Sequence, residues 1–151
     1  MDFLGLARGA HSALQVVALS GAAALILVTS LAWLAGRRGG PWASVPWALS
    51  LALIAIVPVA VALSAAVGLV LFAEIGGPRD GLHAVYGAVA LLALPLGWVL
   101  GAGPPRGPDD PGDPTEGPDA SLLPLSGRHV AWLVAGAVIT IGALARLADT
   151  G

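Results

Sequence analysis

Four long runs of apolar residues dominate this sequence and decide what it can fold into. They cover residues 11–35, 47–73, 82–102 and 129–148. As a helix rising ~1.5 Å per residue, each run is long enough to cross about 30 Å of hydrocarbon. Strands of a membrane barrel would alternate apolar and polar residues, and these runs do not. Because the bilayer core offers no water to backbone polar groups, the sequence predicts four transmembrane helices.

The composition supports an integral membrane protein of one domain. Of the 151 residues, 57% are hydrophobic and 11% are charged, whereas about 25% are charged in soluble domains. The first two connections are short, which favours antiparallel neighbours. We therefore predict an all-α integral membrane protein, a single four-helix antiparallel transmembrane bundle over residues 1–151.

The third connection differs from the other two. Residues 104–121 are dense in Pro and acidic residues, a composition typical of a solvated tether and also usable as a docking site for a basic partner. Arginines favour the cytoplasmic face of a membrane. Four of them flank the first and third connections, and three lie on the opposite face: Arg37, Arg38, Arg106 and Arg128 against Arg8, Arg79 and Arg146. This bias predicts both termini outside and the 104–121 segment in the cytoplasm.

The same composition argues against several function classes. The net charge is −2 without a large basic patch, which argues against nucleic-acid binding. The chain has no Cys, which excludes thiol chemistry. No charge lies mid-span, as a transporter would need, and no Ser, His and acid combination suggests a hydrolase, so an enzyme is not predicted. The bias towards Gly, Ala and Arg is typical of a GC-rich bacterial genome, and it places the protein in a bacterial cytoplasmic (inner) membrane as a multi-pass protein.

Two histidines open alternate runs. His11 begins the first and His83 begins the third, so four spans bring both imidazoles to the same leaflet. Helices one and three run parallel in such a bundle and can face each other across the core. Two neutral imidazoles placed in this way can be axial ligands of haem b. His129 opens the fourth run on the opposite face, so it cannot join the same site.

The residues around this pair suit a flat macrocycle. Ala18, Gly87 and Ala90 lie one or two turns along the helices from the histidines and would leave room for a porphyrin. Arg146 and Arg79 lie on the same face and could pair with its propionates. The competing interpretation is structural. Histidines are common at helix ends, and small residues commonly pack membrane helices together.

Two segments resemble the haem-ligand helices of heme A synthase. The stretch GLVLFAEIGGPRDGLHAVYGA (residues 68–88) is similar to a helix with a Gly-containing apolar end, a short turn and a His that opens the next helix. HSALQ (residues 11–15) is similar to the other ligand helix. The resemblance covers roughly residues 11–101, three helices of one bundle. It implies a bundle that holds haem through His11 and His83 near the outer face.

The sequence also departs from that family. Ser12 and Ala84 follow the histidines where the family usually has Arg. Glu74 is the nearest candidate for the family's catalytic acid, but it lies in the turn, and a single bundle lacks a second haem site. The resemblance thus implies a haem-binding protein for electron transfer or haem handling rather than a synthase. The alternative is a cofactor-free accessory subunit of a larger respiratory or photosynthetic complex. The tryptophans near the span ends fit either hypothesis.

Overall fold

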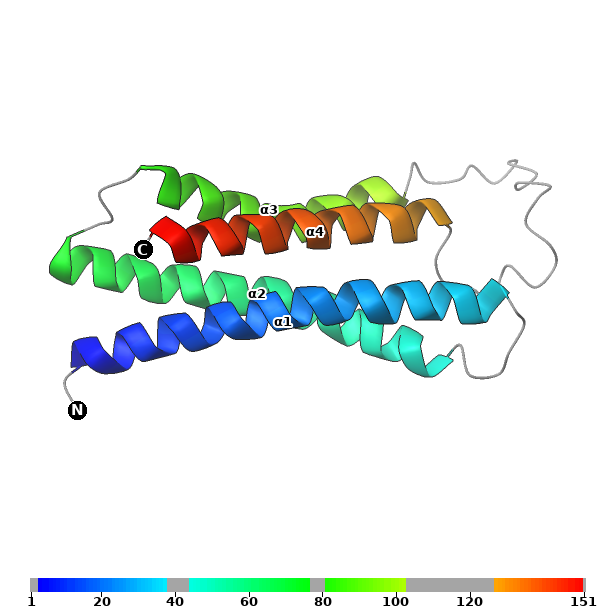
Figure 1. The fold of residues 1–151 in the computed structure, drawn as a ribbon, viewed down its shortest axis with the longest axis horizontal. Helices are drawn as coiled ribbons and strands as arrows, with labels where there is room; N and C mark the ends of the chain where they lie inside the picture. The colour runs from blue at the N-terminus through cyan, green and yellow to red at the C-terminus, as the bar shows by residue number, and fades with distance from the viewer. Residues whose placement is uncertain (1–2, 38–43, 77–80, 103–126, 151) are drawn as a thin grey trace.

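The computed structural model describes residues 3–37, 44–76, 81–102 and 127–150. These residues form α1 (Phe3–Arg37), α2 (Ser44–Ile75), α3 (Leu82–Ala102) and α4 (Gly127–Thr150). Successive helices run in opposite directions along one long axis (Figure 1). All four are long and apolar enough to cross a membrane. The predicted all-α, four-helix antiparallel transmembrane bundle is therefore confirmed.

Most helices reach beyond the apolar runs that predict them. α1 begins at Phe3 rather than at residue 11, α2 begins at Ser44 rather than at residue 47, and α3 covers 82–102. Phe, Leu and Ala in residues 3–10 sustain the helix, and Arg8 among them is exposed. At 35 residues, α1 is about 52 Å long, so its ends project past a hydrocarbon core of about 30 Å. The predicted tether at 104–121 lies outside the described residues.

The bundle is assembled from two hairpins of sequence neighbours. The closest packing is between α1 and α2 and between α3 and α4, and the two hairpins meet mainly where α1 lies against α4. The contact between α2 and α3 is the least extensive. Within the described ranges α1 and α3 make no close approach, so they are the diagonal pair of the bundle.

Small side chains make up much of the core, as expected where van der Waals packing rather than the hydrophobic effect joins helices in lipid. The core has three clusters along the axis. The cluster nearest the chain termini combines alanines with larger residues from α2 and α4: Ala18, Ala60, Val61, Ala90, Ala143, Leu144 and Leu147. The middle cluster holds Ala22, Leu25, Val57, Leu94 and Ala137. The third holds Val130 and Leu133, with Trp33 and Trp98 packed against them.

Helices α3 and α4 approach so closely that two glycines are required. A Cβ atom placed on Gly97 would lie 2.6 Å from the Trp132 main-chain oxygen, and one placed on Gly136 would lie 2.6 Å from that of Ala93. Both distances are too short for real atoms. The hairpin therefore depends on backbone contact at these two positions.

The outer surface is apolar along the helices. Large side chains such as Val16, Leu69 and Val99 are more than 60% exposed. In water such a surface would be unfavourable, whereas lipid tails cover it at little cost. The protein is thus a multi-pass membrane protein with its apolar faces against the bilayer.

Candidate functional site

His11 lies at the centre of a polar cluster between α1 and α2. Its Nδ1 atom is 2.9 Å from the main-chain oxygen of Ser64 and 3.1 Å from the Ser64 hydroxyl. Its Nε2 atom is 3.1 Å from Nε2 of Gln15, one turn along α1. The imidazole is half-buried, so both of its nitrogens are engaged by protein groups from two helices.

The partners of the ring determine where its proton lies. A carbonyl oxygen only accepts hydrogen bonds, so Nδ1 carries the hydrogen and donates it to Ser64. The amide nitrogen of Gln15 only donates, so Nε2 of His11 is the acceptor. His11 is therefore a neutral imidazole with its lone pair on Nε2. In this tautomer the lone pair that could bind a metal ion is on Nε2, where it accepts the hydrogen bond from Gln15.

Gly68 provides the space in which the His11 ring lies. A Cβ atom at this position would be 3.2 Å from Cε1 of the ring and 3.6 Å from Nδ1. Ser64 and Gly68 are one turn apart on the same face of α2. Ser64 supplies the hydrogen-bond acceptor, and Gly68, which has no side chain, leaves room for the ring beside it. The imidazole lies close against α2 because neither residue has a large side chain.

His83 opens α3 at the end of the bundle where α1 begins and α4 ends (Figure 1). Its side chain is half-buried. The structure thus places His11 and His83 at the same end of diagonal helices, as four spans require. Joint ligation of one iron by the two histidines stays a prediction.

The small residues expected to line a porphyrin differ in their surroundings. An added Cβ on Gly87 would meet nothing within 4 Å, so there is open space beside α3 one turn from His83. Ala18 and Ala90 are 0% and 2% exposed and belong to the cluster that also contains Leu144 and Leu147. The space beside Gly87 is open, whereas the space at the level of the two alanines is filled.

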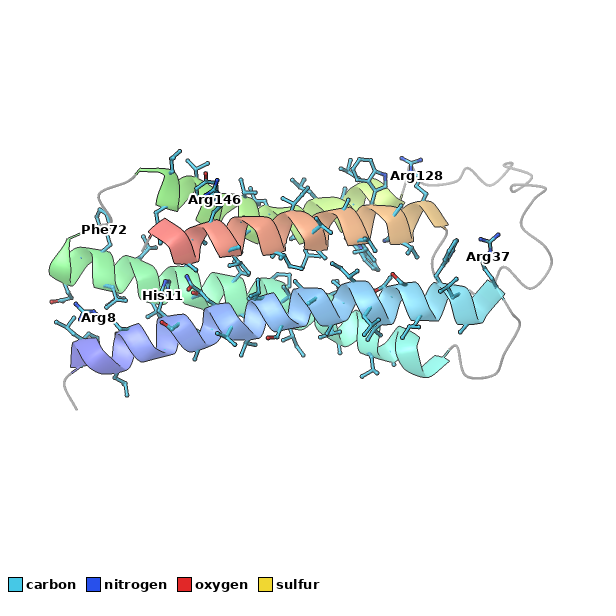
Figure 2. The ribbon with its side chains drawn as sticks, in the orientation of Figure 1. Arg8, His11, Arg37, Phe72, Arg128 and Arg146 are labelled. Atoms are coloured by element: carbon cyan, nitrogen blue, oxygen red, sulfur yellow. The ribbon has the colours of Figure 1, made fainter. Side chains whose placement is uncertain are left out.

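Two arginines in the part of the chain that the structure describes lie at this end of the bundle. Arg8 and Arg146 are both exposed, and Figure 2 shows them at the end that holds His11, whereas Arg37 and Arg128 lie at the other end. Arg79 lies outside the described residues. Glu74, the nearest candidate for a catalytic acid, is exposed at the end of α2.

His129 belongs to a separate cluster at the opposite end. Its ring packs edge-on against Trp98, with ring centroids 4.5 Å apart. A Cβ on Gly101 would lie 2.8 Å from Cδ2 of His129, so this glycine admits the imidazole between α3 and α4. Nearby, Arg37 lies 4.7 Å from the Trp33 ring centroid, a cation–π contact typical of a membrane interface. His129 is too far along the axis to share a site with His11.

Sequence reasoning missed the role of Ser64 and Gly68. Ser and Thr inside membrane helices commonly bond to the backbone of their own helix. Thr140 does so, donating to the Gly136 oxygen at 2.9 Å, whereas Thr29 donates to Ser50 across the α1–α2 contact. Ser64 instead contacts His11. The available signal was the spacing of Ser64 and Gly68, which lie one turn apart and therefore on one face of α2.

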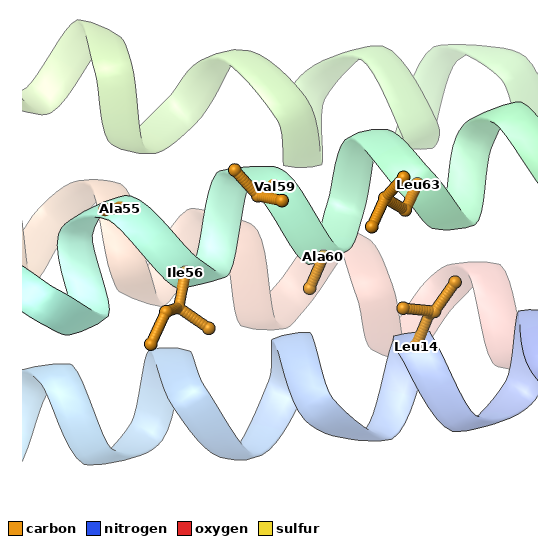
Figure 3. A pocket seen from close by; sticks show the side chains of 6 residues that line it. All are labelled: Leu14, Ala55, Ile56, Val59, Ala60 and Leu63. Atoms are coloured by element: carbon orange, nitrogen blue, oxygen red, sulfur yellow. The ribbon is translucent and has the colours of Figure 1, made fainter.

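A surface groove lies between α1 and α2 further along the helices (Figure 3). It has a volume of about 340 Å³ and purely apolar side chains around it: Leu14, Ala55, Ile56, Val59, Ala60 and Leu63. A groove of this kind suits a lipid chain and offers no group for chemistry.

Comparisons with known proteins add no family to these observations. No protein-family model, curated protein or solved structure matches the chain. Within the described ranges, no group of three or more His, Asp or Glu residues could hold a metal ion. The candidate site therefore rests on the geometry of the His11 cluster.

Proposed function

We propose that this protein binds haem b through His11 and His83, as a small membrane protein for electron transfer or haem handling. The observation that carries the proposal is the 2.9 Å hydrogen bond from Nδ1 of His11 to the Ser64 main-chain oxygen. Histidines that bind metals nearly always donate their second ring N–H to a carbonyl or carboxylate, which fixes the tautomer and makes the ligand more basic.

The surroundings of His11 fit the group in part. The open space beside Gly87 suits the edge of a porphyrin, and Arg146 is exposed at the same end of the bundle, where a propionate could reach it. Ala18 and Ala90 are already packed with Leu144 and Leu147. A porphyrin that contacts both alanines must therefore take the place of these leucine side chains, and α4 must shift to admit it.

A haem with two histidine ligands would supply reversible one-electron transfer. The protein's own part is to orient the ligands and to exclude water. Ser64 holds the His11 ring against α2, and Gly68 leaves it room. The half-buried His83 at the start of α3 would complete the pair from the diagonal helix. Arg146 and Arg79 would hold the propionates near the membrane surface. The resemblance to heme A synthase agrees with this arrangement, and the location that goes with it is a bacterial inner membrane.

An absorption spectrum of purified full-length protein, titrated with haem in detergent, tests the proposal. We expect a low-spin, reduced-minus-oxidised haem signal that disappears in His83→Ala and His11→Ala. His129→Ala is the matched control because this histidine lies at the other end of the bundle, and it should keep the signal.

A protein without that signal in any variant would instead fit the accessory-subunit hypothesis. Both α2 and α3 expose apolar side chains, such as Val59 and Leu92. A neighbouring membrane subunit could pack there. Copurification of the same partners by wild type and by His11→Ala would support that alternative.

A further inference from the structure

Two arginines from different hairpins lie at the end of the bundle opposite the chain termini. Arg37 is the last residue of α1 and Arg128 is the second residue of α4, and Figure 2 shows both at this end. Both side chains are exposed. The guanidinium carbon of Arg37 is 4.7 Å from the centroid of the Trp33 ring. A Cβ atom on Gly127, the neighbour of Arg128, would lie 3.6 Å from Nε1 of the same ring. The two arginines therefore extend from backbone positions beside one indole.

No carboxylate offsets these two charges among the described residues at this end. Residues 30–37, 44–50, 95–102 and 127–133 contain neither Asp nor Glu. The cation–π contact with Trp33 positions the Arg37 guanidinium without removing its charge. The described surface at the junction of α1 and α4 is therefore cationic.

Each arginine has an exposed apolar side chain one turn further into the membrane. Leu34 precedes Arg37 by one turn of α1 and is 46% exposed, and Trp132 follows Arg128 by one turn of α4 and is 41% exposed. Both pairs belong to helices that are long and apolar enough to cross a membrane. Tryptophans commonly mark the level of the lipid headgroups. The protein surface thus changes from apolar to cationic over one helical turn, as a bilayer changes from acyl chains to phosphates.

We infer that Arg37 and Arg128 together bind the phosphate of one anionic phospholipid, whose acyl chains lie along Leu34 and Trp132. Arginine suits this partner because its planar guanidinium donates paired hydrogen bonds to phosphate oxygens, and basic surfaces between membrane helices bind anionic headgroups. A zwitterionic headgroup carries its own ammonium, which offsets the attraction, so the partner is a lipid with a net negative charge. This lipid site does not depend on the proposed haem function. The bound lipid would bridge the two hairpins at the end where α1 finishes and α4 begins.

Native mass spectrometry of the full-length protein in detergent, titrated with phosphatidylglycerol or phosphatidylcholine, tests the inference. Wild type should bind one phosphatidylglycerol more tightly than it binds phosphatidylcholine. We expect Arg37→Gln and Arg128→Gln each to bind phosphatidylglycerol about fivefold more weakly, the factor that one arginine near an anionic surface contributes. Binding of phosphatidylcholine should not change. Arg8→Gln is the matched control, because it removes the same charge from an exposed position at the opposite end, and it should keep the wild-type affinity.

A change at Trp33 separates the position of the Arg37 guanidinium from its charge. Trp33→Leu keeps both arginines and removes the ring beneath Arg37. We expect its affinity for phosphatidylglycerol to fall about threefold, as the loss of an exposed cation–π contact predicts. Trp33→Phe keeps an aromatic face and should bind nearly as tightly as wild type. Equal affinities of Trp33→Leu and wild type would overturn the placement of the headgroup beside Trp33.

The number of bound lipids tests whether the two arginines share one headgroup. Arg37→Gln, Arg128→Gln and the double variant should all lose the same single, tightly bound phosphatidylglycerol. The loss of one lipid by each single variant and of two by the double variant would show two separate charge contacts and would overturn the shared site.

Three further outcomes would also refute the lipid site. Equal binding of the two lipids by wild type would do so, and would point to the acidic residues of the 104–121 segment as the partners of the arginines. An equal loss in Arg8→Gln would show a general attraction between the protein's charge and the lipid. Displacement of phosphatidylglycerol by inorganic phosphate at the same concentration would show that the arginines bind a free anion and that the acyl chains contribute nothing.

Discussion

His11 depends on a neighbour that has no side chain. The 3.2 Å separation between the Cε1 atom of its ring and a Cβ placed on Gly68 leaves room for hydrogen only. A larger residue on α2 must push the imidazole away from the Ser64 oxygen. The orientation of the His11 ring therefore depends on two features of α2: the missing Cβ atom of Gly68 and the hydrogen bond to the Ser64 oxygen.

Replacing Gly68 with Val tests this dependence. We expect the substitution to break the contact between His11 and the Ser64 oxygen and to lower the unfolding free energy by about 1–2 kcal/mol, from lost hydrogen bonding and overpacking. Thermal unfolding in detergent measures the effect. Gly9→Val is the control, since a Cβ there meets nothing within 4 Å. Equal stability of the two variants would refute the close fit of His11 on α2.

A change at Ser64 separates the two hydrogen bonds that it makes to the His11 ring. Ser64→Ala removes the hydroxyl at 3.1 Å but keeps the main-chain oxygen at 2.9 Å. The proton should therefore stay on Nδ1, and stability should fall by no more than about 1 kcal/mol. The ¹⁵N signals of the His11 ring report the tautomer. A proton found on Nε2 in this variant would show that the hydroxyl, and not the carbonyl, sets it.

Among the helices, α3 and α4 are joined by backbone contact at glycines. Gly97→Leu and Gly136→Leu should each force the two helices apart and destabilise the protein by at least about 2 kcal/mol, because the atom each would add lies 2.6 Å from a main-chain oxygen. Gly142→Leu on α4 is the matched control, with nothing within 4 Å of its added Cβ. Unfolding midpoints in a denaturing detergent series compare the three. Since Leu favours helix more than Gly does, Gly142→Leu should keep or raise stability, and a loss as large as in the other two variants would refute the packing explanation.

The helices could be predicted from the sequence because hydropathy is a local property. α3 covers the predicted 82–102, and α1 exceeds its predicted span, running from Phe3 to Arg37. The partners of His11 could not be predicted in the same way. The rotation of α1 against α2 decides whether Ser64 bonds to its own helix or to His11. That rotation depends on how Gly21, Val57 and the other contacts between the two helices pack together.

For the whole molecule, the arginines predict an orientation that remains to be measured. Arg37 and Arg128 lie at one end of the bundle, and Arg8 and Arg146 lie at the other (Figure 2). If both termini lie outside, Arg106 lies in the cytoplasm, within the predicted 104–121 segment. Added trypsin should then cleave after Arg106 in inverted vesicles and not in sealed right-side-out vesicles. Cleavage at Arg106 from the outside of right-side-out vesicles would reverse the orientation.

The division into two hairpins also bears on the order in which the protein is made. The first hairpin, α1 and α2, carries His11, Gln15, Ser64 and Gly68. These two helices are synthesised before α3 and α4, and each packs more extensively on the other than on the second hairpin. The ribosome can release this pair into the membrane before α3 exists. The imidazole of His11 would then be aligned, and its proton placed, during translation. His83 would be inserted later, with the second hairpin, when the His11 ring is already held by Ser64 and Gln15.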